Sequence, residues 1–335
     1  MIADGLKLRG VVFDEDRTIA VCSHIARSWR TKSKALGGQI SPEVIHLPCS
    51  IEYGSLDHVR YLLFIGWLSR SGKTADEVIE SGARVAIREP WLLTHQGICD
   101  HSVAHYGSIM KFMVPYAETK NQRDLYLWWR ECCETVERKP FNGDLRNVFL
   151  RHTSVISKDD RWRSRELIIN DLCQLKGIAH KIAQLIAIWV QEVNWSKNAI
   201  KWNRIRKIPF IPVDLWCMRL VYMSGMVIGF NGDHRDRIGR LISDYLSKVC
   251  LEHDISHTDL AQGLWHIGAR IHAKMPRNTK QTQYCHDRCP LHNYCTRIVN
   301  SDPVNRQRGL IGWHSAVPRS AYPYTTSIFT EPAGL

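Results

Sequence analysis

Hydrophobic residues recur at three- and four-residue spacing along most of this chain, which is the pattern of amphipathic helices. From Leu56 onward, Val59, Leu62, Leu63 and Trp67 follow this spacing. The same pattern predicts further helices over residues 75–87, 122–137, 163–174, 180–193, 215–228, 235–250 and 258–273. Strand-like alternation is almost absent after residue 50. We therefore expect a mostly α fold.

The two ends of the chain lack this pattern. Residues 11–13 and 19–21 are short apolar runs that we interpret as two strands, and the tail from Pro303 shows no period. The chain is accordingly divided into an N-terminal extension of unknown role (1–54), a helical core (55–300) and a C-terminal tail (301–335). The longest apolar run, Tyr61 to Leu68, is far shorter than the ~20 residues of a membrane span, so we expect no membrane insertion.

The charge balance narrows the class of partner. Lys and Arg number 45 against 33 Asp and Glu, giving a net charge of +12. This excess favours a polyanion, either nucleic acid or an acidic membrane surface, although many soluble proteins are equally basic and bind neither. The first residues lack the basic and apolar stretches of a secretory signal, so we expect a cytoplasmic protein.

Eleven cysteines are present, and most are scattered as expected of small buried apolar side chains. Cys285, Cys289 and Cys295 are the exception, because they cluster within eleven positions. Three cysteines at this spacing, together with His272, His286 or His292, provide donors for zinc or an iron–sulfur cluster. The alternative is that these cysteines are merely buried.

A candidate DNA-binding turn lies at residues 175–183, which read Leu-Lys-Gly-Ile-Ala-His-Lys-Ile-Ala. A glycine in the turn lets backbone approach a phosphate. The N-terminus of the helix that follows offers N–H groups and the positive end of its dipole. The alternative is an ordinary glycine-capped turn followed by a surface lysine.

This segment resembles the hairpin of the helix-hairpin-helix DNA glycosylase superfamily, the group of endonuclease III and the adenine-mismatch glycosylase. The usual form is Leu-Pro-Gly-(Ile/Val)-Gly-x-Lys-x-Ala. Leu175, Gly177, Ile178, Lys181 and Ala183 match it, whereas Lys176 replaces the proline and Ala179 the second glycine. By resemblance Lys181 is the nucleophilic lysine, and DNA is contacted by Lys176, Gly177, Ile178, Ala179 and His180.

A second matching segment supplies a carboxylate. Residues 213–219, Val-Asp-Leu-Trp-Cys-Met-Arg, resemble the family's Val-Asp-Thr-His-x-x-Arg in Val213, Asp214 and Arg219. The resemblance makes Asp214 the catalytic carboxylate, which stabilises positive charge on the deoxyribose and activates the attacking water or lysine, and it makes Arg219 a DNA contact. The alternative role for Asp214 is a helix N-cap, and the two roles are compatible.

Between these segments, residues 195–207 interleave basic and aromatic side chains. Such a stretch suits a loop that grips the DNA backbone or inserts between bases, with Lys201 and Arg204 as the DNA contacts and Trp195 and Trp202 as the aromatics. A solvated charged loop is the alternative.

The cysteine cluster follows these segments in the family's order. In endonuclease III relatives, four cysteines hold a [4Fe–4S] cluster, and the Cys289-x5-Cys295 spacing matches the last two. Three residues separate Cys285 from Cys289, whereas the family has two at this point. His272 stands where the family's first cysteine is expected. The resemblance therefore implies His272, Cys285, Cys289 and Cys295 as ligands in a loop over residues 272–295, of a [4Fe–4S] cluster or alternatively of zinc.

The resemblance covers about residues 55–298. It implies two helical lobes with a cleft in which Lys181 faces Asp214, and a cysteine-cluster loop at the C-terminal end. The implied activity is that of a monomeric enzyme that flips a damaged or modified base out of double-stranded DNA and cleaves its N-glycosidic bond, with or without AP-lyase activity.

The divergent motifs resemble a branch associated with hypermodified phage bases, including the α-glutamyl/putrescinyl-thymine pyrophosphorylases and antiviral glycosylases. A transferase that modifies such a base and a non-catalytic DNA-binding module are the two alternative functions. The sequence does not name the base.

Overall fold

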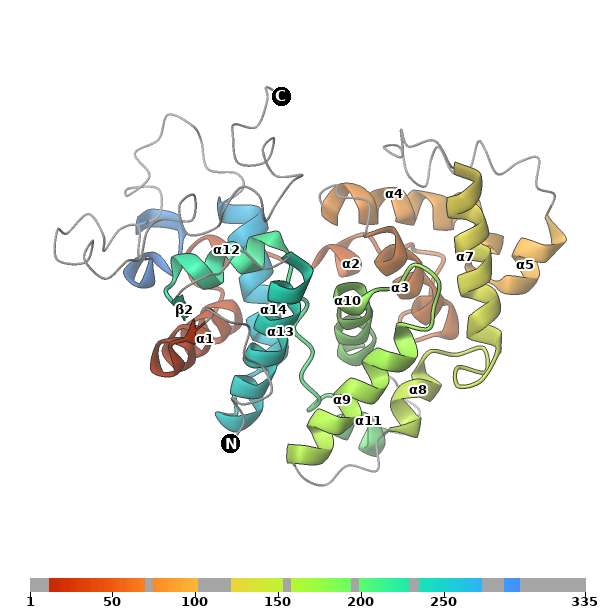
Figure 1. Cartoon of the computed structure of the whole chain (residues 1–335). Coiled ribbons are helices and arrows are strands. Elements are labelled where there is room, and N and C mark those ends of the chain that lie inside the picture. Colours follow the sequence, from red (N-terminus) through yellow and green to blue (C-terminus); the bar gives the residue numbers. More distant parts are fainter. Residues whose placement is uncertain are drawn as a thin grey trace. The chain divides into compact units, whose positions relative to one another are not determined.

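The computed structural model (Figure 1) describes residues 12–69, 75–101, 122–152, 158–193, 199–228, 235–272 and 286–295. The expectation of a mostly helical protein is confirmed, since these residues form two strands of two residues each and are otherwise dominated by helices. The chain divides into two compact units. One is formed by residues 40–210, and the other combines residues 1–39 with residues 211–335.

The 40–210 unit is built from helices around α3. Its elements are α2 (Pro42–Ile45), α3 (Leu56–Leu68), α4 (Ala75–Arg88), the 3₁₀ turn η3 (Pro90–Leu93), α5 (His95–Asp100), α7 (Gln122–Glu137), α8 (Arg146–Arg151), α9 (Lys158–Leu172), α10 (His180–Glu192) and α11 (Ala199–Ile205). Tyr61, Phe64 and Trp67 of α3 are fully buried. A Cβ on Gly66 would lie 2.4 Å from Cγ1 of Ile186, so the glycine allows α10 to pack directly on α3.

The second unit joins the two ends of the chain. Its elements are β1 (Val12–Phe13), α1 (Glu15–Arg30), the 3₁₀ turn η2 (Lys34–Leu36), α12 (Leu215–Met223), β2 (Val227–Ile228), α13 (Arg235–Glu252), α14 (His257–His266), the π-helix η5 (Ile267–His272) and the 3₁₀ turn η6 (His292–Tyr294). The strands pair antiparallel, with Val12 opposite Ile228 and Phe13 opposite Val227.

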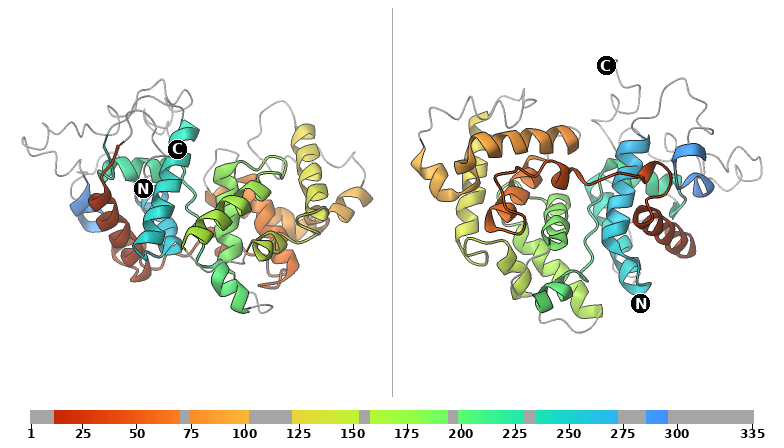
Figure 2. Two further views of the ribbon diagram at one scale, coloured as in Figure 1. Left: turned by 60° about the horizontal axis from the view of Figure 1, so that its bottom comes forward. Right: turned by 180° about the vertical axis from the view of Figure 1, so that it is seen from behind.

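Helix α1 runs beside α14 (Figure 2). Asp14 caps α1 by accepting a hydrogen bond from Arg17 N, and Val21, Ile25 and Trp29 are buried along one face. A Cβ on Gly263 of α14 would lie 2.5 Å from Cγ2 of Ile25, so this glycine admits the α1 side chain. The prediction of a strand at residues 19–21 is wrong, because these residues belong to an amphipathic helix.

Most predicted helices are confirmed, with two informative differences. Helix α12 ends at Met223 and not at residue 228, because Gly225 adopts φ +74° and turns the chain into β2. The α-helical part of α14 ends at His266, and the chain continues as a π-helix. Among the described residues, no helix combines the length and the apolar character needed to cross a membrane.

The cysteines outside the cluster fall into two groups. Cys22, Cys132, Cys133, Cys217 and Cys250 are buried as expected, and burial raises the pKa of the Cys22, Cys133 and Cys250 thiols. The other group is exposed and comprises Cys49, Cys99 and Cys173.

Candidate functional site

The turn between α9 and α10 is a tight hairpin anchored in the core of its unit. Gly177 has φ +81°, a left-handed conformation that glycine adopts at low cost. Ile178 N donates to the carbonyl of Leu175 at 3.0 Å, and both side chains are buried, so they anchor the turn in the core. Trp67 Nε1 donates to the Lys176 carbonyl at 2.9 Å, which ties the turn to α3.

The N-terminus of α10 has no side-chain cap. Its N-cap residue, Ala179, is extended and has no side chain that could accept a hydrogen bond. The first-turn N–H groups of a helix need acceptors from outside the helix, so an uncapped end suits an anion such as phosphate. Lys181 lies in this first turn, and its side chain is exposed.

Two side chains beside the turn are engaged within the unit. Lys176 Nζ lies 3.4 Å from Glu131 of α7 and 5.9 Å from the ring centroid of Trp128. His180 Nδ1 lies 3.0 Å from Gln184 Nε2.

The buried Arg165 determines the orientation of the Gln184 amide. Arg165 can only donate, so Gln184 Oε1 accepts from it, at 3.2 Å, and Gln184 Nε2 donates to the His180 ring. A neutral His180 therefore carries its proton on Nε2.

Asp214 is the N-cap of α12, so the capping role weighed from the sequence is confirmed. Its Oδ1 accepts a hydrogen bond from Cys217 N at 2.8 Å, and its carbonyl accepts from Met218 N at 2.9 Å. Oδ2 forms no hydrogen bond with any described residue, and the side chain is half-buried. The helix thus fixes one of the two carboxylate oxygens.

Two contacts hold the start of α12 in place. Ser243 Oγ of α13 donates to the Ile211 carbonyl at 2.7 Å. A Cβ on Gly268 of the π-helix would lie 2.7 Å from Trp216 Cβ, so the glycine lets the two helices meet at their backbones. The Arg219 guanidinium lies 4.4 Å from the centroid of the Trp216 ring.

The basic segment before Asp214 is largely helical. Trp202 in α11 is buried, and its Nε1 donates to the Gln191 carbonyl at 3.2 Å, so this side chain packs inside its own unit. Arg206 donates to the Glu192 and Val193 carbonyls at 3.4 Å and therefore satisfies the C-terminal end of α10. Arg204 is exposed. Lys201 belongs to α11, whereas Lys197 and Trp195 lie outside the described residues.

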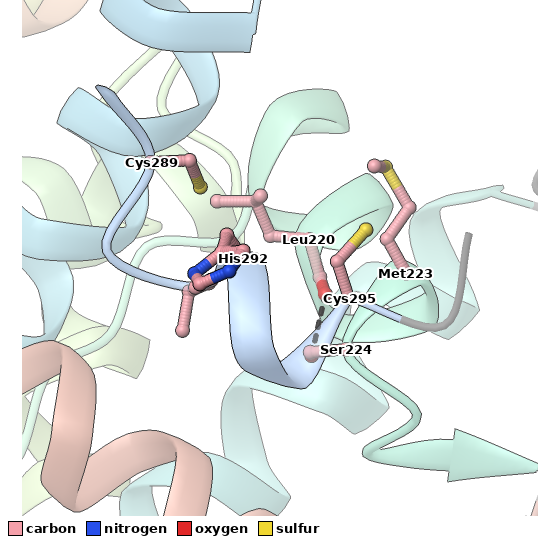
Figure 3. Close-up of a pocket in the computed structure, with 7 residues that line it drawn as sticks. Leu220, Met223, Ser224, Cys289, His292 and Cys295 are labelled. Atoms are coloured by element: carbon pink, nitrogen blue, oxygen red, sulfur yellow. Dashed lines mark hydrogen bonds between the residues drawn. The ribbon is translucent and has the colours of Figure 1, made fainter. Parts of the chain in front are cut away.

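The described part of the cysteine loop borders a pocket against α12. Cys289 and Cys295 are buried and line it together with Leu220, Met223, Ser224, Leu291 and His292 (Figure 3). The cavity is small, with a volume of about 10 Å³. Burial lowers the pKa of His292, and Lys34 and His286 lower it further.

The other two predicted ligands are not described in the same detail. Cys285 lies outside the described residues, and of His272 only its place at the end of the π-helix is described. Among the described His, Cys, Asp and Glu side chains, no trio in this loop has its ligating atoms within 4.8 Å of one another.

The sequence assigned no role to the N-terminal segment. In the structure, side chains of this segment donate hydrogen bonds to backbone carbonyl groups of the cysteine loop. Arg17 donates to the Tyr294 carbonyl at 2.7 Å and to the Ser224 carbonyl at 2.8 Å. His24 Nε2 donates to the Pro290 carbonyl at 2.9 Å. Lys34 Nζ donates to the carbonyls of His286 at 2.6 Å and Cys289 at 3.3 Å. Side-chain to backbone bonds of this kind leave no signal in the sequence.

The chain matches no protein-family model, and comparisons with curated proteins and with solved structures give no match either.

Proposed function

We propose that the chain is a DNA glycosylase of the helix-hairpin-helix type. The observation that carries the proposal is the hairpin at residues 173–179. Three features of this hairpin suit the binding of a DNA backbone phosphate. They are the glycine turn, the buried anchors Leu175 and Ile178, and the N-terminus of α10, which has no side-chain cap. The net charge of +12 supports a polyanionic partner.

In the proposed reaction, the target nucleotide is flipped out of the duplex, because its glycosidic bond is otherwise buried in the base stack. The Asp214 carboxylate stabilises the positive charge that develops on the deoxyribose as the base departs. The oxygen that accepts no helix hydrogen bond, Oδ2, suits this role, since it carries charge without disturbing the cap.

Lys181 is the proposed nucleophile. In a lyase-competent enzyme its amine attacks C1′ as the bond to the base breaks, and opening of the sugar ring at C1′–O4′ then gives the Schiff base. In a monofunctional enzyme it positions the attacking water. Its place in the first turn of α10, directly after the hairpin, supports either role.

We further propose that the cysteine loop holds a metal centre. Two buried cysteines and a histidine lining one pocket are a donor set that suits an iron–sulfur cluster or zinc. Its role is structural, holding the loop in a fixed conformation. The divergent hairpin and loop support a specialised substrate, and we propose a modified base, such as a hypermodified base of phage DNA.

Mass spectrometry of products from several natural and phage DNAs tests the proposal. A glycosylase releases a free nucleobase and leaves abasic sites. An intact glycosidic bond with a changed base mass would replace the proposal with a base-modifying transferase. Salt-dependent binding without any product from these DNAs would reduce it to a DNA-binding module.

A further inference from the structure

We propose that Cys99, paired with His95, is a thiol-modification site that takes a low-molecular-weight disulfide and forms a mixed disulfide with it. Both residues belong to α5 (Figure 1), and Cys99 Sγ lies 3.6 Å from His95 Nε2. No residue of the proposed glycosylase reaction takes part in this site, so the site does not depend on that function.

Helix α5 is short, but contacts near both of its ends hold it in place. At its start, Thr94 is the N-cap, and its Oγ1 accepts a hydrogen bond from Gly97 N at 3.0 Å. After its end, His101 Nδ1 donates to the Gly97 carbonyl at 2.7 Å, and the His101 ring stacks on Trp91 with centroids 4.0 Å apart. Side chains four positions apart on a helix lie on the same face, so a helix held in this way keeps the imidazole beside the thiol.

The His95 ring has its nitrogens in different environments. Nδ1 is buried and forms no hydrogen bond with any described residue. A buried N–H group without an acceptor is rarer in proteins than a buried acceptor without a donor, so the neutral ring carries its proton on Nε2. The Nε2–H group therefore donates to the sulfur of Cys99.

This hydrogen bond favours the reactive form of the cysteine. Hydrogen bonds to an ionised acceptor are about twice as strong as neutral ones, so Nε2–H stabilises the thiolate more than the thiol. The thiolate is the form of cysteine that attacks a disulfide. His95 is thus a positioning and stabilising partner, and Cys99 is the nucleophile.

Exposure makes this cysteine accessible to a small molecule. Cys99 is exposed, unlike the buried cysteines of the cores. Cys49 is exposed as well, but among the described residues no histidine ring donates to its sulfur. The chain therefore carries its own reference, an accessible thiol that has no imidazole partner of this kind.

The proposed step is a thiol–disulfide exchange that needs no further oxidant. The Cys99 thiol loses its proton to solvent, and the thiolate attacks one sulfur of the small disulfide. The bond between the two sulfurs breaks, and the leaving thiolate takes up a proton. The products are a mixed disulfide at Cys99 and one free small thiol.

The test is modification of the folded full chain by glutathione disulfide at pH 7. Peptide mass spectrometry, after the remaining thiols have been blocked, gives the rates at Cys99 and at Cys49 in the same molecule. In the wild type, Cys99 should react faster than Cys49. In His95→Ala the ratio of the two rates should fall by about three- to tenfold. The loss is bounded because a less stabilised thiolate is also a stronger nucleophile.

Two further variants separate the imidazole from the helix that carries it. Gln96→Ala removes the hydrogen bond from Gln96 to Asp100 in the same helix and should leave the ratio unchanged. His95→Gln keeps an N–H donor at this position and should react faster than His95→Ala. Circular dichroism shows whether each variant is folded.

Three results would overturn the proposal. The first is modification of Cys49 in the wild type at the same rate as Cys99 or faster, a result that needs no variant. The second is an unchanged ratio in a folded His95→Ala variant. The third is an equal loss in Gln96→Ala, which would assign the effect to the helix and not to the imidazole.

Discussion

Asp214 shows how one carboxylate can serve both the fold and the proposed chemistry. Its Oδ1 caps α12 through Cys217 N, while Oδ2 forms no hydrogen bond with a described residue. The sequence favoured both roles, because Asp is a preferred N-cap and the segment resembles a catalytic motif. The structure confirms the cap, and the catalytic role remains a prediction.

His266 is a residue whose environment the sequence did not reveal. It is fully buried, stacks on Trp29 with ring centroids 4.5 Å apart, and meets Trp265 edge-on at 4.7 Å. Neither ring nitrogen has a hydrogen-bond partner among the described residues. Burial, with Arg270 and Lys32 nearby, lowers its pKa to about 3, so the ring is neutral in the folded protein.

We predict that this histidine destabilises the protein in acid. Between pH 6.5 and about 3, the unfolded chain binds a proton at His266 and the folded chain does not. Stability therefore falls as the pH is lowered, by about 1.4 kcal/mol per pH unit for a fully titrating histidine. Urea unfolding of wild type and His266→Phe at pH 7, 6 and 5 measures this. The advantage of His266→Phe should grow toward pH 5, and a constant difference would contradict the prediction.

At the scale of elements, the sequence predicted helices well because buried positions repeat with helical spacing. Helix α1 was not predicted, because residues 19–21 were interpreted without Ile25 and Trp29. These two residues complete the buried face of the helix. The end of α12 was missed because only the structure shows the positive φ of Gly225. The hydrogen bonds from α1 to the cysteine loop could not be predicted. They join basic side chains to backbone carbonyls far away in the sequence, so they depend on tertiary contacts alone.

We predict opposite effects for two glycines that lie near the start of α12. Gly268→Ala would place Cβ 2.7 Å from Trp216 Cβ and 3.3 Å from its carbonyl carbon, so it should cost about 1–3 kcal/mol of stability. Gly239→Ala in α13 meets only contacts of 3.8 Å and should stabilise by about 0.5–1 kcal/mol through helix propensity. Urea unfolding compares the two variants. Equal effects would show that close packing at Gly268 does not fix α12.

At the scale of the whole molecule, the charge balance and the helical pattern could be predicted from the sequence. Which basic residues remain available to DNA could not, because this depends on local contacts. Arg204 and Arg206 are two positions apart in one basic segment. Arg204 is exposed, whereas Arg206 bonds the carbonyls at the end of α10.

These two arginines give a matched prediction for DNA binding. The affinity for duplex DNA should fall steeply with salt, because bound phosphates release counterions. Arg204→Ala should reduce the slope of log K against log salt by about 1. Arg206→Ala should leave the slope unchanged and lower the melting temperature. Fluorescence anisotropy from low to physiological salt and thermal unfolding measure both effects. An unchanged slope in Arg204→Ala would remove this residue from the DNA contacts.

The most direct test of the central claim is base release by Asp214→Asn on a DNA from which the wild type releases a base. Asparagine is also a good N-cap and can accept the hydrogen bond from Cys217 N, so the fold should be retained. It lacks the negative charge that the transition state requires. We predict a loss of at least about 10²-fold in the rate of base release, as is typical when transition-state electrostatics are removed. An unchanged rate in a folded Asp214→Asn variant would contradict the account.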